Sequence, residues 1–327
     1  MSASAISIQD DKFKSLGLQK TTVNKEQVVT YSRALGAASE KNPVLVLLHG
    51  YPQSSFMWRH LVPLLPGDSP IFVADLPGYG SSTPIEDNSK ISVGSTVLAA
   101  LLTEYKRTSS KSLDQIPIIL IGHDRGARVA HHLAVQGFNG VDIRGLCLID
   151  IRQVPTIVQW ESASRNPSDI VGYFHWPLLA NVSLATRLIN AFGPGNWCEE
   201  MILRWAGKNS SGLSTFKADD SLSVYRQFFE QPHTLDASNK DYEAGATVDV
   251  DTEKGWREKG HKLQIETLVI YSEKYIGSKY DLPEEWRSWV EEDRLSSKAL
   301  GNYIGHFGAE EAPKETAEAI NTWLKKV

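Results

Sequence analysis

One carboxylate in a glycine-framed turn is the residue of this chain whose type and setting best suit covalent chemistry. Asp124 stands at the centre of Gly-His-Asp-Arg-Gly at 122–126, after an apolar run at 116–121 and before a helical pattern. The glycine spacing matches the G-x-S-x-G nucleophile elbow, in which a strained strand-to-helix turn exposes the central side chain. A carboxylate in place of serine predicts displacement at a saturated carbon through an alkyl-enzyme ester. Dehalogenation or epoxide opening therefore fits better than ordinary ester hydrolysis.

A second carboxylate and a histidine follow Asp124 in the chain order of the α/β-hydrolase catalytic triad. Asp150 ends the apolar run 146–149, and His306 lies in Gly-His-Phe at 305–307. We expect Asp124 to displace the leaving group and His306, oriented by Asp150, to deprotonate the water that attacks the ester. The alternative is a glycine-bounded loop with a solvated aspartate, with Asp150 a strand-end turn residue. His-Gly-Tyr-Pro at 49–52, together with Gly-His-Phe, favours the catalytic interpretation.

Backbone donors and two arginines surround the expected nucleophile. The fold places oxyanion donors after the nucleophile and after the His-Gly motif, which here are the backbone N–H groups of Arg125 and Tyr51. The side chains of Arg125 and Arg128 are three residues apart and can converge on one helix face. Paired guanidiniums suit a carboxylate substrate. The alternative is that both arginines pair with structural acids.

Aromatic donors form a second candidate group. Phe-His-Trp at 174–176 supplies His175 and Trp176, and Trp205 and Tyr242 follow. Imidazole, indole and phenol groups donate hydrogen bonds and could surround a leaving halide. For an isolated Phe-His-Trp the alternative is an aromatic helix face packed in the core. His131 and His132 are expected on a helix surface and are given no role.

The elements that must position these residues alternate between strand and helix. Apolar runs at 43–48, 71–74, 116–121, 146–149 and 267–271 predict buried parallel strands, and patterns at 91–105, 129–135, 283–290 and 311–324 predict helices. A helical pattern also covers 56–65, and a hairpin is expected within residues 1–42, with edge strands at 23–31. The alternation predicts an α/β-hydrolase fold, with a mostly parallel sheet flanked by helices.

The alternation is lost for roughly ninety residues after 154, where helical patterns at 170–176, 184–191, 199–205 and 222–229 predict an inserted cap. The expected organisation is therefore a core from 1–154, a helical cap from 155–245, and the second part of the core from 246–327.

Composition narrows the function classes. A formal charge of -5 and a pI near 6.0 show no basic block for nucleic acid or acidic membranes. The two cysteines suggest no disulfide framework, and no apolar run of about 18 residues predicts a membrane span. The N-terminus lacks the pattern of a secretion signal, so a cytoplasmic location is expected.

Several motifs together resemble the fluoroacetate dehalogenase, or haloacetate dehalogenase, family of α/β-hydrolases. They are HGYPQ, ADLPGYG, GHDRGARV, YFHW, DYEAGAT and GHFGAEEAP, spread from about residue 43 to the C-terminus. The resemblance implies that Asp124 attacks the halogen-bearing carbon, that Arg125 and Arg128 hold the substrate carboxylate, and that Asp150 is the triad acid. It also implies the following binding residues: His175, Trp176 and Tyr242 for the halide, and Ile151 and Trp205 along the pocket. Arg152 and Gln153 look inserted relative to the family, beside that pocket.

The resemblance further implies a mechanism without metal or cofactor, and a homodimer. The hypothesis is hydrolytic dehalogenation of a small 2-haloacid, a small anionic substrate, with no nucleic-acid or membrane partner. The main alternative is an epoxide hydrolase that uses the same triad, with Tyr173 and Tyr242 protonating the epoxide oxygen. Arg125 argues against it, because epoxide hydrolases usually carry tryptophan after the nucleophile. A third alternative is a catalytically silent ligand-binding relative.

Overall fold

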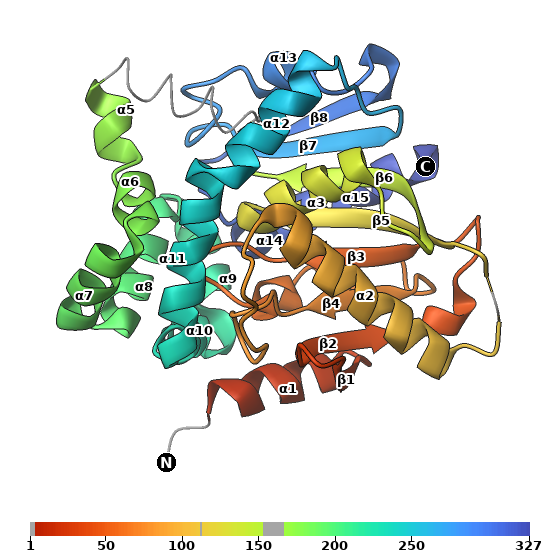
Figure 1. Ribbon diagram of the computed structural model, residues 1–327, viewed down its shortest axis with the longest axis horizontal. Coiled ribbons are helices and arrows are strands. Elements are labelled where there is room, and N and C mark those ends of the chain that lie inside the picture. The colour runs from red at the N-terminus through yellow and green to blue at the C-terminus, as the bar shows by residue number, and fades with distance from the viewer. Residues whose placement is uncertain (1–3, 112, 153–166) are drawn as a thin grey trace.

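An eight-stranded, mostly parallel sheet forms the centre of the molecule. The computed structural model describes residues 4–111, 113–152 and 167–327 (Figure 1). The sheet has the order β1-β2-β4-β3-β5-β6-β7-β8; β2 pairs antiparallel with both neighbours and all other pairs are parallel. The strands are β1 (Gln19–Val23), β2 (Val28–Arg33), β3 (Val44–Leu48), β4 (Ile71–Ala74), β5 (Ile116–His123), β6 (Val141–Ile149), β7 (Glu266–Ser272) and β8 (Leu295–Leu300).

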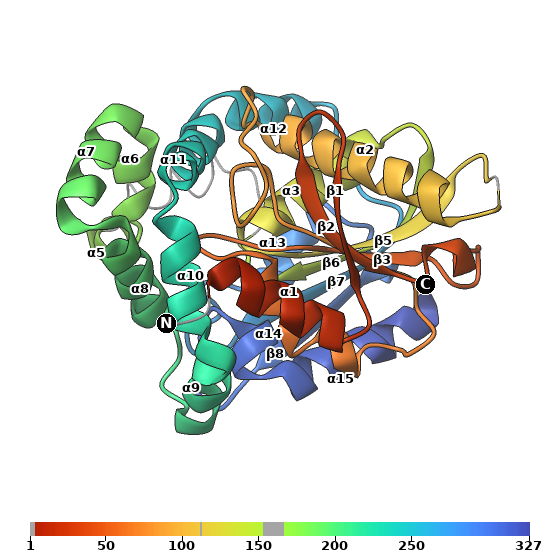
Figure 2. The ribbon, with the colours of Figure 1, turned by 90° about the horizontal axis from the view of Figure 1, so that it is seen from below.

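Helices cover both faces of this sheet, as the unbroken apolar strands require. Every residue of β3, β4 and β5 is buried, which is expected of parallel strands covered on both sides. Figure 2 shows α2 (Lys90–Thr108) and α3 (Arg125–Gln136) on one face and α15 (Pro313–Trp323) on the other. The predicted α/β-hydrolase fold is therefore confirmed.

A group of helices lies beyond one end of the sheet, on the left in Figure 1; we call them the cap. They are α5 (Pro167–Gly172), α6 (His175–Ala180), α7 (Val182–Phe192), α8 (Pro194–Trp205), α9 (Ser210–Lys217), α10 (Ser221–Phe229) and α11 (Pro232–Ala246). Helices predicted at 184–191, 199–205 and 222–229 are confirmed, whereas the one at 170–176 is two helices, α5 and α6. The domain boundaries stay predictions, and the first, after residue 154, lies outside the described residues.

The expectations differ from the structure at several elements. The hairpin is confirmed, but its turn falls inside the range 23–31 that was expected to be strand. The range 56–65 holds two short 3-10 turns, Ser55–Arg59 and Val62–Leu64. The elements that the sequence did not predict are α1 (Ala5–Ser15), α9, α11, α12 (Val248–Glu258), α14 (Gly308–Glu311) and β8, while α13 (Leu282–Trp286) is shorter than expected. Among the described helices, none is both long and apolar enough to cross a membrane.

Candidate active site

The elbow at Asp124 has the strained geometry that its glycine frame predicts. Asp124 follows β5 with φ 47° and ψ -114°, which is an unfavourable conformation for a residue with a side chain. A Cβ on Gly122 would lie 2.5 Å from the Gly126 carbonyl oxygen, and one on Gly126 would lie 2.3 Å from the His49 carbonyl oxygen. Both glycines are therefore needed for the close packing of β5, α3 and the strand-end loop.

The two oxygens of the Asp124 carboxylate have different surroundings. Oδ2 accepts a hydrogen bond from the Tyr51 backbone N–H at 3.0 Å. Oδ1 lies 4.0 Å from His306 Nε2. Burial alone would raise the pKa of Asp124, but His306, His123 and Arg125 outweigh it, so the pKa is lowered. The group is thus an ionised carboxylate with one oxygen held and the other facing the histidine.

His306 and Asp150 form a short, buried hydrogen bond. His306 Nδ1 donates to Asp150 Oδ2 at 2.6 Å, and Asp150 Oδ1 accepts from both the backbone N–H and the hydroxyl of Ser272, at 2.8 and 2.6 Å. Burial would lower the pKa of His306, but the hydrogen bond and charge of Asp150 raise it overall. Ser272 was not predicted as a functional residue, because only its place at the end of β7 brings it to Asp150.

A cavity of about 160 Å³ brings most of the predicted residues together. It is small for a ligand site, so it suits a substrate of a few heavy atoms. The predicted residues that line it are Asp124, Asp150, Ile151, His175, Trp176, Trp205, Tyr242 and His306. Tyr51, Arg125 and Arg128 do not line it, although the Tyr51 backbone reaches Asp124.

Aromatic side chains from the cap pack against one another where they line this cavity. The His175 ring lies 4.7 Å from the Trp205 ring and 5.8 Å from the Tyr242 ring, centroid to centroid. Burial lowers the pKa of His175 to about 3, so the imidazole is neutral and keeps one N–H donor. Within the described chain, Nδ1 of His175 has no hydrogen-bond partner. The arrangement is a cluster of hydrogen-bond donors in the same cavity as the nucleophile.

The two arginines are not among the residues that line the cavity. Arg125 Nε donates to Asp241 Oδ2 at 2.5 Å, and its Nη2 donates to the Asp241 carbonyl oxygen at 2.6 Å. Its guanidinium carbon lies 4.3 Å from the Tyr242 ring centroid, and that of Arg128 lies 5.2 Å from the Trp176 ring centroid. Arg125 thus pairs with a structural acid, which was the alternative given for both arginines in the sequence analysis. Binding of a substrate carboxylate by either arginine stays a prediction.

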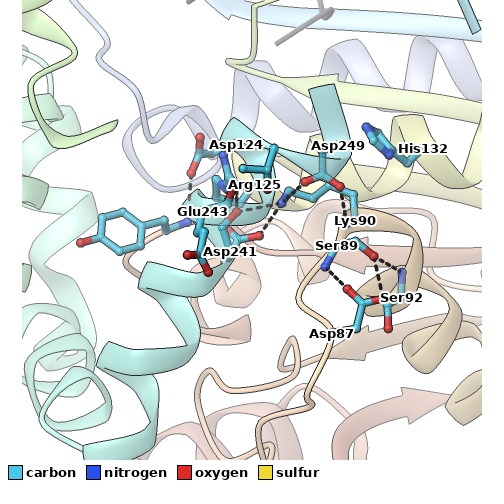
Figure 3. A network of polar contacts seen from close by, with 12 residues as sticks. Asp87, Ser89, Lys90, Ser92, Asp124, Arg125, His132, Asp241, Glu243 and Asp249 are labelled. Atoms are coloured by element: carbon cyan, nitrogen blue, oxygen red, sulfur yellow. Dashed lines mark hydrogen bonds and ion pairs between the residues drawn. The ribbon is translucent and has the colours of Figure 1, made fainter. Parts of the chain in front are cut away.

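Asp241 is part of a buried network of two cations and two carboxylates. Lys90 Nζ donates to Asp241 Oδ1 at 2.6 Å and to Asp249 Oδ2 at 3.0 Å, and Lys90 is 1% exposed. Figure 3 shows the contacts running from Arg125 through Asp241 to Lys90 and Asp249. The network joins α3 and the start of α2 in the core to α11 of the cap. No sequence pattern singled out Lys90.

Three other cationic side chains line the cavity: Arg152, Arg204 and Lys279. Arg152 Nη2 pairs with Glu285 at 2.7 Å, and Arg204 lies over the Phe174 ring at 5.2 Å. Arg152 thus borders the pocket, as the apparent insertion suggested, while Gln153 lies outside the described residues. In the described ranges, no group of three or more His, Cys, Asp or Glu side chains could hold a metal ion.

Comparisons with known proteins point to two activities within one fold. A fluoroacetate dehalogenase from a Burkholderia species is 28% identical over 284 residues, which cover 86% of this chain and 87% of that protein. A soluble epoxide hydrolase from a Corynebacterium species is 26% identical over 285 residues, which cover 86% of this chain and 88% of that protein.

Solved structures with the same fold are also similar to this chain. A candidate alpha/beta hydrolase from a Nostoc species matches with a TM-score of 0.79 at 30% identity, covering 96% of this chain and 100% of that one. A candidate epoxide hydrolase from Pseudomonas aeruginosa matches with a TM-score of 0.77 at 27% identity, covering 95% and 96%. The model of the alpha/beta hydrolase family matches residues 45–319, most of the chain. The protein therefore belongs to the alpha/beta hydrolase family and is a hydrolase.

Proposed function

We propose that the protein hydrolyses the carbon–halogen bond of small 2-haloacids, converting a haloacetate to glycolate and halide. One observation carries the proposal: Asp124 shares a cavity of about 160 Å³ with His175, Trp176 and Tyr242, whose side chains all have hydrogen-bond donors. A nucleophile for carbon thus faces a set of donors suited to a halide. The similarity to a fluoroacetate dehalogenase supports the same assignment.

The first half-reaction uses the oxygen of Asp124 that faces His306. Oδ1 attacks the carbon that bears the halogen, and the carbon–halogen bond breaks with its electron pair on the halide. Oδ2 becomes the carbonyl oxygen of the resulting ester. The donors of His175, Trp176 and Tyr242 stabilise the charge that develops on the leaving halide.

The second half-reaction regenerates Asp124. His306 Nε2 takes a proton from water as the water oxygen attacks Cγ of the ester, and Asp150 stabilises the imidazolium. Oδ2 carries the negative charge of the tetrahedral intermediate and is stabilised by the Tyr51 backbone N–H, which lies 3.0 Å from it before reaction. Collapse breaks the bond from Cγ to Oδ1, and the product alkoxide takes the proton from His306. Asp124 is left as a carboxylic acid that carries the second proton of the water, and release of this proton to solvent restores the carboxylate.

The substrate carboxylate is assigned to the positive charge of Arg125 and Arg128, as the family resemblance implies. Arg125 contributes to the lowered pKa of Asp124, so its charge acts at the cavity although its Nε and Nη2 are bonded to Asp241. Arg204 and Lys279, which line the cavity, add positive charge. This local field favours entry of an anion into a protein whose formal charge is -5.

The experiment that tests the proposal measures halide release from bromo-, chloro- and fluoroacetate beside diol formation from styrene oxide. We expect halide and glycolate in equal amounts and no diol. Asp124→Asn should lower halide release by at least about 10⁴-fold, because the nucleophile is lost. His306→Asn should retain the first half-reaction and leave the Asp124 peptide heavier by a carboxymethyl group in mass spectrometry. Diol without halide would refute the proposal.

Epoxide hydrolysis is the second candidate, because Tyr173 and Tyr242 both line the cavity of Asp124. Two phenols near the nucleophile could protonate an opening epoxide. The hydroxyl of Tyr173 donates to the Tyr280 hydroxyl at 3.2 Å, however, so it is engaged elsewhere. The styrene oxide arm of the experiment decides between the two candidates.

We also propose a homodimer and a cytoplasmic location. The cap helix α7 exposes Leu184, Leu188 and Phe192 by 45, 51 and 54%, and neighbouring exposed apolar side chains are typical of a protein interface. Light scattering of the purified protein should give twice the chain mass of 36.3 kDa. Cell fractionation tests the location.

A further inference from the structure

A buried glutamate binds the backbone on both sides of His306. Glu311, which ends α14 and is 4% exposed, accepts the Phe307 N–H on Oε1 at 3.1 Å. Its Oε2 accepts the Gly305 N–H at 3.0 Å and the Gly207 N–H at 2.8 Å. Gly305 and Phe307 flank His306, whereas Gly207 follows α8 of the cap. One carboxylate therefore joins the histidine loop to the cap.

The two backbone segments also touch directly. The His306 N–H donates to the Trp205 carbonyl oxygen at 3.0 Å, so all three amides from Gly305 to Phe307 are bound. A Cβ on Gly207 would lie 2.4 Å from the Gly305 nitrogen, and one on Gly305 would lie 2.1 Å from the Gly207 nitrogen. Only glycine fits at both positions, which gives a physical reason for the glycine that precedes His306.

We propose that Glu311 is a positioning residue for His306. Its carboxylate fixes the loop that carries His306 relative to the cap. The inference rests on the proposed role of His306 as the base of the second half-reaction. The imidazole must meet Asp150 through Nδ1, at 2.6 Å, while its Nε2 faces Asp124. A shift of the loop by a fraction of an ångström alters both contacts, and a misplacement of about 1 Å can cost about 10²-fold in rate.

If Glu311 had a merely structural role, the expected effect of its loss would be different. If Glu311 only stabilised the fold, its loss would lower the stability and leave the ratio of the two half-reactions unchanged. If it positions His306, its loss slows ester hydrolysis selectively, because His306 removes a proton only in that step. The ratio of the two rate constants therefore separates the roles.

The test uses Glu311→Gln, which keeps the shape of the side chain but turns one acceptor into a donor that faces backbone N–H groups. In single turnovers of chloroacetate with the whole protein, rapid quenching and mass spectrometry follow the Asp124 ester. We expect the rate constant for ester hydrolysis to fall about 10- to 100-fold, with ester formation changed less than about threefold. Equal changes in both constants, or no change, would overturn the proposal.

A second readout needs no substrate, so it separates this inference from the proposed function. The proton between His306 Nδ1 and Asp150 should give a downfield proton NMR signal, assigned by its loss in His306→Asn. We expect that signal to move or to exchange faster in Glu311→Gln. An unchanged signal would count against positioning even if haloacetates prove not to be substrates, whereas absence of halide release from the wild type would refute only the function.

Two further variants complete the design. Glu310 is the neighbouring buried carboxylate, but its side chain accepts from Tyr225 at 2.7 Å and pairs with Arg59. Glu310→Gln should therefore lower the stability without changing the ratio of rate constants or the downfield signal. If Glu311→Gln does not fold, Glu311→Asp keeps the carboxylate but shortens the side chain by one methylene, so it should weaken the same contacts and change both readouts in the same direction.

Discussion

Two buried clamps fasten the cap to the core, one beside the nucleophile and one beside the base, and they use different chemistry. The Asp241 clamp consists of Lys90, Arg125, Asp241 and Asp249, two cations and two carboxylates (Figure 3). The Glu311 clamp consists of the Glu311 carboxylate and the backbone N–H groups of Gly207, Gly305 and Phe307. The Asp241 clamp binds charged side chains, whereas the Glu311 clamp binds the backbone of the loop that carries His306.

The pKa values of the two carboxylates express this difference. Burial raises the pKa of both groups, but at Asp241 the charges of Arg125 and Lys90 prevail and the pKa is lowered. At Glu311 the backbone hydrogen bonds do not offset burial, and the pKa is raised. Full charges thus stabilise a buried carboxylate where peptide dipoles alone do not. The Asp241 clamp should therefore contribute more to the stability of the fold, and the Glu311 clamp should contribute more to the position of His306.

Removal of the central cation should have the largest effect on stability. Lys90→Met leaves Asp241 with one cation in place of two and removes the lysine partner of Asp249. Breaking a buried ion pair in this way typically costs about 3–5 kcal/mol, so the urea midpoint of unfolding should fall clearly. Adding Asp249→Asn to Lys90→Met should recover part of the loss, because it removes an uncompensated charge.

Lys240 offers a matched control for Lys90. It precedes Asp241 in α11, and its Nζ lies 2.7 Å from Asp236 Oδ2, but the two side chains are 45 and 48% exposed. Exposed pairs contribute about 0–1 kcal/mol, so Lys240→Met should change the unfolding free energy little. A loss for Lys90→Met no larger than that for Lys240→Met would remove the distinction between the clamps.

The sequence predicted the catalytic residues better than the buried ion pairs that hold the site in place. Asp124 could be identified because glycines must flank a tight elbow, and β3 and β5 because both faces of each strand are apolar. Lys90 and Asp241 could not be paired, because they are 151 residues apart in the chain and no periodicity links them. For the same reason the sequence did not reveal Asp241 as the partner of Arg125, which lies 116 residues away in the chain.

Unpredicted helices have a similar cause. The buried face of α11 includes Thr234, Ser238, Asn239 and Asp241, so the apolar period that reveals an amphipathic helix is weak. His131 and His132 were expected on a surface and are instead fully buried, because α3 is covered by residues from α12 such as Glu253, which lies 2.8 Å from His132. Buried polar side chains cannot be told from surface residues by sequence period alone.

The two half-reactions should also differ in their dependence on pH. Hydrolysis of the ester needs neutral His306, whose pKa lies above its ordinary value of 6.5 because of Asp150. Its rate constant should therefore rise about tenfold per pH unit below that pKa and level off above it. Formation of the ester needs ionised Asp124, whose pKa is lowered from 3.8, so it should be flat between about pH 5 and 8. Single-turnover measurements of both constants check this; a shared midpoint would mean that His306 also controls the first step.

The smallest expected effect concerns how the contribution of each clamp to the free energy of unfolding changes with pH. The two contributions should change in opposite directions. Asp241 has a lowered pKa, so its contribution to stability is present above 3.8 and is lost only as the pH falls through its folded value. Glu311 has a raised pKa, so its contribution is present below 4.5 and is lost as the pH rises through its folded value. In urea unfolding, the difference between wild type and Glu311→Gln should therefore shrink as the pH rises above 4.5, by at most about 1.4 kcal/mol per unit. The difference for Asp241→Asn should stay constant over the same range. If the Glu311→Gln difference grew with pH instead, three peptide N–H groups would hold a buried carboxylate as firmly as two cations do.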